Sequence, residues 1–148
     1  MQLSKHFSLA EATRSTTAQS AKIANTPDAT QLAAMTAAAL GMEQVRALLG
    51  HKSITPTSWF RSRRVNALVG GTATSDHVGG WAVDFAPPSG WTLLGAAKAI
   101  RDSGLVFDQM IMETSRGIIH ISFDPKQRRQ VGEQRRGAGT PIVWRLPS

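Results

Sequence analysis

The sequence predicts an α+β fold, in which helices from the first half of the chain pack on a small, mainly antiparallel sheet formed by the second half. Three patterns predict it: a helical period of apolar residues over 32–49, an alternating pattern over 81–86, and two strand-like runs at 106–113 and 118–123. With 148 residues, 41% of them hydrophobic and none cysteine, the chain can bury a core without disulfides. We therefore expect one domain over residues 1–148, with a basic tail from about residue 126.

Two helix starts lie in the first half of the chain. Ser8 and Glu11 have the spacing of a capping box, which opens a short helix. A polar stretch follows up to Pro27, and Asp28 is placed to cap a second, longer helix. The apolar residues of that helix are three or four positions apart: Leu32, Met35, Ala39, Met42, Val45 and Leu49. Gly50 is typical of the residue that follows a helix C-cap, so the helix should end just before it.

Two segments in the middle of the chain predict strands. Residues 54–58 predict a short strand. Because Pro56 has no N–H to donate, this strand should lie near a sheet edge, or Pro56 should lie at its start. Residues 81–86 alternate between large and small side chains, so Asp84 lies on the face opposite the bulky Val83 and Phe85.

The next residues predict a helix followed by a β-hairpin. An amphipathic pattern runs over residues 92–103. Residues 106–113 and 118–123 then predict two antiparallel strands, because the four residues 114–117 between them suit a turn.

Two histidines and an aspartate form a candidate metal site. Asp84 is flanked only by small alanines on its strand face, and His120 lies on the face opposite the bulky isoleucine side chains beside it. His77 lies in the loop before the strand of Asp84, and Gly79-Gly80 would let this loop fold back. Two imidazoles and one carboxylate are ligands of a catalytic zinc ion that keeps one position open for water. We expect His77, Asp84 and His120 to hold one Zn²⁺ ion.

Glu113 is the candidate general base. It shares a strand face with Gln109 and Ile111 and ends its strand across the hairpin from the neighbourhood of His120. Its carboxylate would therefore reach a water at the metal. Asp108, earlier in the same strand, is the alternative base.

The charge of the chain favours a polyanionic partner. The net charge is +7, and basic residues concentrate at 61–64 and in the tail from 126 to 136. Anionic polymers of a bacterial envelope, anionic lipid and nucleic acid all fit this charge. Since no recognised nucleic-acid-binding motif accompanies the basic runs, we do not expect a nucleic-acid partner.

The N-terminus and the apolar segments predict neither a leader nor a membrane anchor. Residues 1–7 have no charged stretch followed by an apolar core, so no signal peptide is expected. The longest apolar-rich segment, 32–49, is interrupted by polar residues and is an amphipathic helix rather than a membrane span. If the protein acts outside the cytosol, another factor must release it.

The residues around the candidate site resemble the M15 family of zinc peptidases, which includes D-Ala-D-Ala carboxypeptidases and L-Ala-D-Glu endopeptidases. The family motif Ser-x-His-x-x-Gly-x-Ala-x-Asp is matched by Ser75, His77, Gly80, Ala82 and Asp84. The segments His120-Ile121-Ser122 and Phe107-Asp108-Gln109 are similar to two further family strands. Matches within 3–15, 25–27 and 57–71 extend the resemblance, which covers the chain to about Val131.

This resemblance implies a hedgehog-like fold and zinc-dependent hydrolysis of peptide bonds in bacterial peptidoglycan, and we expect a monomer. It supports Glu113 as the base, and implies that Arg61 holds a substrate carboxylate or the oxyanion and that Ser75 hydrogen-bonds the substrate. The most similar branch is short, single-domain and common in bacteriophages, so an endolysin is implied. Such an enzyme would be made in the host cytoplasm and would reach the cell wall in the periplasm by holin-type release or from a virion.

Two departures from the family pattern stand out. Trp59-Phe60 replaces a Gly-Tyr pair before Arg61, which removes a phenolic hydroxyl and adds bulk near the expected substrate groove. Many relatives carry the catalytic carboxylate three residues before the last histidine, where this chain has Gly117.

Other functions remain open at this level. A catalytically inactive, metal-stabilised module that binds cell wall or belongs to a virion would keep the three ligands. A nucleic-acid binder or a nuclease would explain the charge. The L-Ala-D-Glu, D-Ala-diaminopimelate and D-Ala-D-Ala bonds all suit recognition of a carboxylate by Arg61, and another divalent ion could replace zinc.

Overall fold

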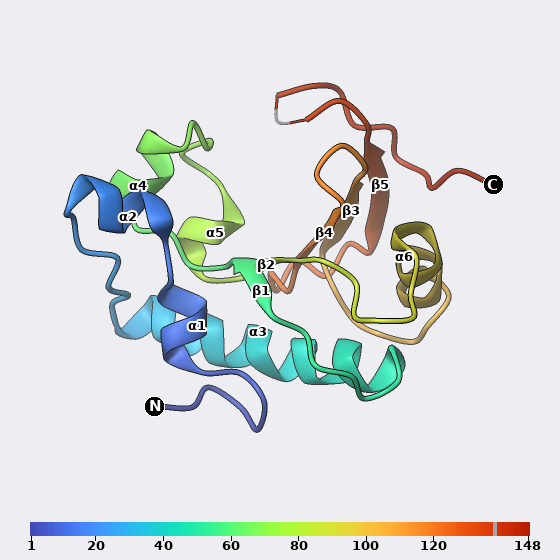
Figure 1. Cartoon of the computed structure of the whole chain (residues 1–148), viewed down its shortest axis with the longest axis horizontal. Helices are drawn as coiled ribbons and strands as arrows, with labels where there is room; N and C mark the ends of the chain where they lie inside the picture. Colours follow the sequence, from blue (N-terminus) through green and yellow to red (C-terminus); the bar gives the residue numbers. More distant parts are fainter. Residues whose placement is uncertain (138) are drawn as a thin grey trace.

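A five-stranded sheet with the order β1-β2-β4-β3-β5 is the centre of the computed structural model, which describes residues 1–137 and 139–148 (Figure 1). Its strands are β1 (Pro56–Ser58), β2 (Ala82–Phe85), β3 (Gln109–Glu113), β4 (Ile118–Ser122) and β5 (Gln130–Gln134). Three of the four pairings are antiparallel, and β3 pairs with β5 in parallel. The predicted α+β class and the mainly antiparallel sheet are confirmed, and β1 lies at the edge where Pro56 placed it.

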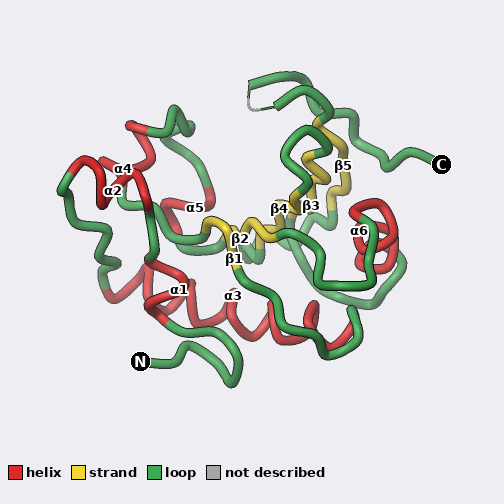
Figure 2. Tube along the Cα trace, in the orientation of Figure 1, coloured by secondary structure: helices red, strands yellow, loops and turns green. Residues whose placement is uncertain are grey.

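The described residues also form six helices, and Figure 2 shows them on either side of the band of strands. They are α1 (Leu9–Thr13), α2 (Thr16–Ala21), α3 (Ala29–Leu48), α4 (Arg63–Leu68), α5 (Asp76–Gly79) and α6 (Leu93–Arg101). None of the helices in the described part of the chain is both long enough and apolar enough to span a bilayer.

The predicted caps of α1 and α3 are confirmed. Both helices start with a complete capping box, Ser8 with Glu11 and Asp28 with Gln31, so each box satisfies two backbone N–H groups. Gly50 follows the C-cap of α3 with φ +94°, a left-handed conformation that favours glycine.

The core lies between one face of the sheet and the helices α3 and α6. The apolar face of α3 buries Met35, Ala39, Met42, Val45 and Leu49 completely. The strands contribute the residues that alternate away from Asp84 and His120: Val83, Phe85, Ile119, Ile121, Met110 and Met112. Because the apolar set is buried against α3, the opposite face of β2, β3 and β4 carries the polar candidates.

Three short helices were not predicted. α2 lies in the polar stretch after the first helix, α4 follows Arg61, and α5 contains His77, which was expected in a loop. A helix of four to six residues is too short to show an apolar period, so only its caps are visible in the sequence. Ser15, Ser62 and Ser75 are these N-caps, and each accepts a backbone hydrogen bond from the following turn.

The segment predicted as a basic tail from about residue 126 contains a strand that was not predicted. Residues 130–134 form β5, and the chain then returns so that Val143 pairs with Glu133 and Leu146 is buried in the core. The polar sequence of β5 has no clear alternation. This segment is a strand because it pairs with the free edge of β3, which the sequence does not reveal. In addition, β3 starts at Gln109 rather than at the predicted residue 106.

Gly80 offers a test of how α5 is seated on α3. Its φ is +88°, and a Cβ added there would lie 2.8 Å from the Gln31 carbonyl oxygen and 2.8 Å from Met35 Cγ. We expect Gly80→Ala to lower the free energy of unfolding by about 2–4 kcal/mol, because backbone strain and overpacking add together. Urea denaturation measures this change.

Gly50→Ala is the matched control for Gly80→Ala. Gly50 has a similar positive φ, but no atom lies within 4 Å of the added Cβ. Gly50→Ala should lower the free energy of unfolding by only about 1–2 kcal/mol, the cost of placing alanine in the left-handed conformation. Equal losses in the two variants would contradict the close packing of Gly80 against α3.

Candidate metal centre

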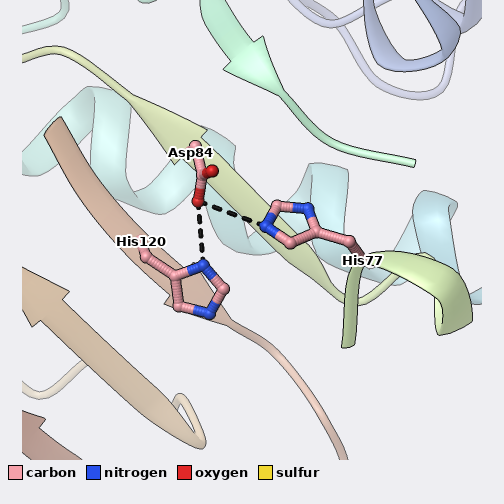
Figure 3. A group of neighbouring side chains, drawn as sticks. All are labelled: His77, Asp84 and His120. Atoms are coloured by element: carbon pink, nitrogen blue, oxygen red, sulfur yellow. Dashed lines mark hydrogen bonds and ion pairs between the residues drawn. The ribbon is translucent and has the colours of Figure 1, made fainter. Parts of the chain in front are cut away.

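Three elements bring His77, Asp84 and His120 together. Asp84 on β2 and His120 on β4 are directly opposite each other in the antiparallel register, and α5 presents His77 from the side (Figure 3). Asp84 Oδ1 lies 3.3 Å from His77 Nε2 and 2.8 Å from His120 Nδ1. One ligand atom from each residue lies within 4.8 Å of those of the others. The three side chains that the sequence proposed as ligands are therefore neighbours.

The local structure fixes the orientation of His77. Ser75 Oγ accepts the His77 backbone N–H, and Gly80 ends the helix in the left-handed conformation. The His77 Nδ1 atom is 2.6 Å from the carbonyl oxygen of Trp59. Because a carbonyl can only accept, Nδ1 carries a proton, and Nε2, which faces Asp84, is the ring nitrogen left for a metal. A metal ion would therefore bind His77 through Nε2.

Trp59 stabilises this arrangement through both its backbone and its side chain. Its carbonyl binds His77, and its indole Nε1 donates to the Gly80 carbonyl at 3.1 Å. Its ring is 1% exposed and packs edge-on against Phe7. The bulky residue that departs from the family pattern is thus buried behind the site rather than placed in the substrate groove.

Asp84 is a buried carboxylate held in its charged form. Burial alone would raise its pKa, but the charges and hydrogen bonds of His77 and His120 hold the pKa of Asp84 well below its usual range. Burial lowers the pKa of His120, and the hydrogen bond and charge of Asp84 outweigh this and raise the pKa of His120 overall. Two imidazoles around an anionic carboxylate fit a divalent cation such as zinc, which would replace the proton that they share.

A cavity of about 200 Å³ opens in front of these three residues. Its lining includes the three other residues predicted for the site, Arg61, Ser75 and Glu113. Ile111, Arg116 and Gln134 complete the lining. The structure therefore brings all six predicted site residues to one cavity.

Only one of the two candidate bases lies at this cavity. Glu113 lines it and is 6% exposed, and its Oε1 accepts a hydrogen bond from Arg116 at 2.9 Å. Asp108 lies elsewhere, bound by both ends of the Arg128 guanidinium at 2.8 Å and grouped with Asp76 and Asp124. Its fully buried carboxylate is thus occupied by an ion pair outside the cavity.

Arg61 and Ser75 both have structural contacts. Arg61 Nη1 donates to Asn66 Oδ1 at 3.2 Å, and burial lowers the pKa of its guanidinium, which remains positively charged. Ser75 caps α5 through its Oγ, so it positions His77 in addition to lining the cavity.

Arg116 is a cavity residue that was not predicted. It lies in the turn between β3 and β4, pairs with Glu113, and its Nη2 is 4.0 Å from Asp84 Oδ2. Its side chain is 46% exposed, so it can rearrange. The sequence places Arg116 three residues after Glu113, in the turn that leads to His120. Residues of a hairpin turn are usually exposed to solvent, so this position alone did not mark Arg116 as a site residue.

The raised pKa of His120 predicts a pH dependence of stability without metal. A group whose pKa is raised on folding stabilises the folded state below its unfolded pKa, about 6.5 for histidine, and loses this effect as the pH rises through the folded value. In EDTA, the stability difference between wild type and His120→Asn should therefore be largest between about pH 5 and 6.5 and shrink above it. Urea denaturation across this range measures it.

His51→Asn is the matched control, because it removes an exposed histidine outside the cavity and asparagine tolerates its left-handed φ of 58°. A stability difference for His120→Asn that grows with increasing pH would contradict the ion pair with Asp84.

Comparison with known proteins agrees with this geometry. A family model described as Peptidase M15 matches residues 5–122, which include all six predicted site residues. A search of curated proteins finds no match. The match covers well over half of the chain and ends at the last residue of β4. The chain belongs to the M15 peptidase family.

Proposed function

We propose that this chain is a zinc-dependent peptidase that hydrolyses a peptide bond in the stem peptides or cross-links of bacterial peptidoglycan. The observation that carries the proposal is the buried Asp84 carboxylate, held between two imidazoles at a cavity that also contains Glu113 and two arginines. Membership of the M15 peptidase family supports the reaction class.

His77, Asp84 and His120 would hold the zinc ion. When bound, zinc would polarise the scissile carbonyl and lower the pKa of the attacking water. The Trp59 carbonyl keeps His77 in the tautomer that ligates through Nε2. Asp84 contributes the negative charge that offsets part of the charge of the ion.

Glu113 would act as the general base. Its carboxylate lies at the same cavity as the three ligands, so it would accept a proton from the attacking water and deliver it to the leaving amine. Arg116 holds Glu113 in place through their 2.9 Å ion pair. Because Arg116 is half-exposed, a substrate carboxylate can compete for its guanidinium and leave Glu113 free.

Arg61 and Arg116 would recognise the acidic part of the substrate. Both guanidinium groups line the cavity and suit bidentate contacts with a carboxylate, or stabilisation of the oxyanion. Ser75 would add a hydrogen bond to the substrate. The L-Ala-D-Glu, D-Ala-diaminopimelate and D-Ala-D-Ala bonds each have a carboxylate nearby, so each would suit recognition by these arginines.

The biological setting we propose is lysis of a bacterial cell by a bacteriophage. The chain would act as a monomer that reaches the wall from the host cytoplasm by holin-type release, or as part of a virion. A net charge of +7 would concentrate it on an anionic envelope.

Zinc binding is tested by thermal unfolding. Addition of Zn²⁺ to the chelated protein should raise the Tm by about 5–10 °C when the free ion is in hundredfold excess over its Kd, since only the folded state has the site. His120→Asn should lose most of this shift, whereas His51→Asn should retain it. An equal shift in both variants would place the ion elsewhere.

Catalysis is tested by digestion of purified peptidoglycan, followed by mass spectrometry of the fragments. Glu113→Gln should reduce the rate by about two to four orders of magnitude and keep the zinc-dependent Tm shift, because it removes the base and no ligand. Asp108→Asn is the control, and its fragments should match those of wild type.

Two results would argue against this assignment. If Asp108→Asn abolished cleavage and Glu113→Gln did not, Asp108 would be the base. If wild type bound peptidoglycan in a metal-dependent way and released no fragments, the chain would be a non-catalytic wall-binding module. The fragment masses of an active enzyme would identify the bond that is cut.

A further inference from the structure

A second cavity lies at the opposite end of β3 and β5 from the metal centre. Gln109 and Gln130, which begin these strands, line it, whereas Glu113 and Gln134, which end them, line the metal-centre cavity. Four residues along a strand separate the two cavities by roughly 13 Å. The second cavity has a volume of about 700 Å³, and we call it the arginine cavity because its lining includes Arg101, Arg128, Arg129 and Arg145.

The arginine cavity has a surplus of positive charge. Arg101 pairs with Asp102, and Arg128 pairs with Asp108. Within the part of the chain that the structure describes, Arg129 and Arg145 form no ion pair with a carboxylate. Two of the four guanidinium charges are therefore not compensated by a neighbouring acid, and an anionic ligand would compensate them.

Two of the arginines are held in position before any ligand arrives. Asp108 fixes Arg128 through two hydrogen bonds of 2.8 Å. Arg129 donates to the carbonyls of Leu105 and Ser103 at 2.9 Å and stacks on the ring of Phe107 at 4.5 Å. Such a fixed guanidinium loses little side-chain entropy on binding a ligand.

The loop that carries these arginines has a strained backbone. Gln127 has a φ of 48° and Arg129 a φ of 52°, so two non-glycine residues in three adopt the left-handed conformation. Residues held in this way persist only where the surrounding contacts require them, and they are concentrated at binding sites. Here the contacts of Arg128 and Arg129 maintain the strain and direct both side chains to the same cavity.

An exposed aromatic ring forms one side of the cavity. Trp144 is 50% exposed, and it lies over β5 because Gly132 leaves room for it. A Cβ added at Gly132 would lie 3.0 Å from the Trp144 ring. A flat apolar surface beside several guanidinium groups suits a ligand that joins an anionic group to a ring.

We propose that the arginine cavity binds a phosphate group carried on a sugar. A phosphate presents several oxygens and up to two charges, so it can accept hydrogen bonds from more than one guanidinium at once. The Trp144 ring would stack on the sugar. The four arginines line one cavity of about 700 Å³, a size that suits a compact phosphosugar better than a nucleic-acid strand. Such a site would hold the protein on a phosphate-bearing polymer of the bacterial envelope.

The proposal is tested by calorimetric titration of the whole chain at low salt with glucose 1-phosphate, inorganic phosphate and glucose. Glucose 1-phosphate should bind more tightly than inorganic phosphate, glucose should give no heat, and added salt should weaken binding. Arg145→Gln should weaken the binding of glucose 1-phosphate about tenfold, since it removes a charged donor. Trp144→Ala should reduce the affinity to that for inorganic phosphate.

Arg64→Gln is the matched control, because it removes an exposed arginine on α4, away from this cavity, and should leave binding unchanged. Thermal melts should show that all three variants are folded. If Arg64→Gln and Arg145→Gln weakened the binding of glucose 1-phosphate equally, the binding would depend only on the net charge of the protein, which would overturn the proposal. So would the absence of binding, equal affinity for the two phosphates, or tighter binding of a short oligothymidylate.

This test is independent of the peptidase proposal, since it measures binding and not hydrolysis. A chain without peptidase activity would still bind glucose 1-phosphate if the arginine cavity is a phosphosugar site. An active peptidase that fails to bind it would contradict only the inference drawn from this cavity.

Discussion

The buried carboxylate of Asp84 is the constraint on which the rest of the site depends. A charge that is 1% exposed is unfavourable unless partners surround it, and Asp84 has an imidazole on each side. One of these imidazoles comes from the neighbouring strand, and the other from a separate helix. The fold must therefore bring both histidines to this carboxylate, and the register of the sheet and the seating of α5 achieve this.

One face of the sheet packs into the core, and the other carries the candidate site. The face toward α3 is apolar and fills the core, so it sets which residues of β2, β3 and β4 can point the other way. On that other face, Asp84, His120 and Glu113 meet at one cavity. A shift of one residue in the pairing of β2 with β4 would turn Asp84 into the core, which is why the apolar pattern also protects the site.

Several features of the site were visible in the sequence, because they depend on residues close together along the chain. The alternation in 81–86 and 118–123 placed Asp84 and His120 on faces without bulky neighbours, and their pairing in the structure agrees with this. The one-turn helix around His77 was missed, since four residues are too few to show a period. β5 was missed as well, because its strand character comes from pairing with β3.

The sequence by itself determined the fold class, the long helix, the hairpin and the candidate ligands, since periods, caps and turns are properties of neighbouring residues. Tertiary structure decided between the two candidate bases, since Glu113 lines the cavity and Asp108 lies outside it, paired with Arg128, twenty residues further along the chain. It likewise decided that Arg116 joins the site and that four arginines from three separate segments line one cavity. Such contacts depend on how distant segments pack, and no local pattern in the chain encodes them.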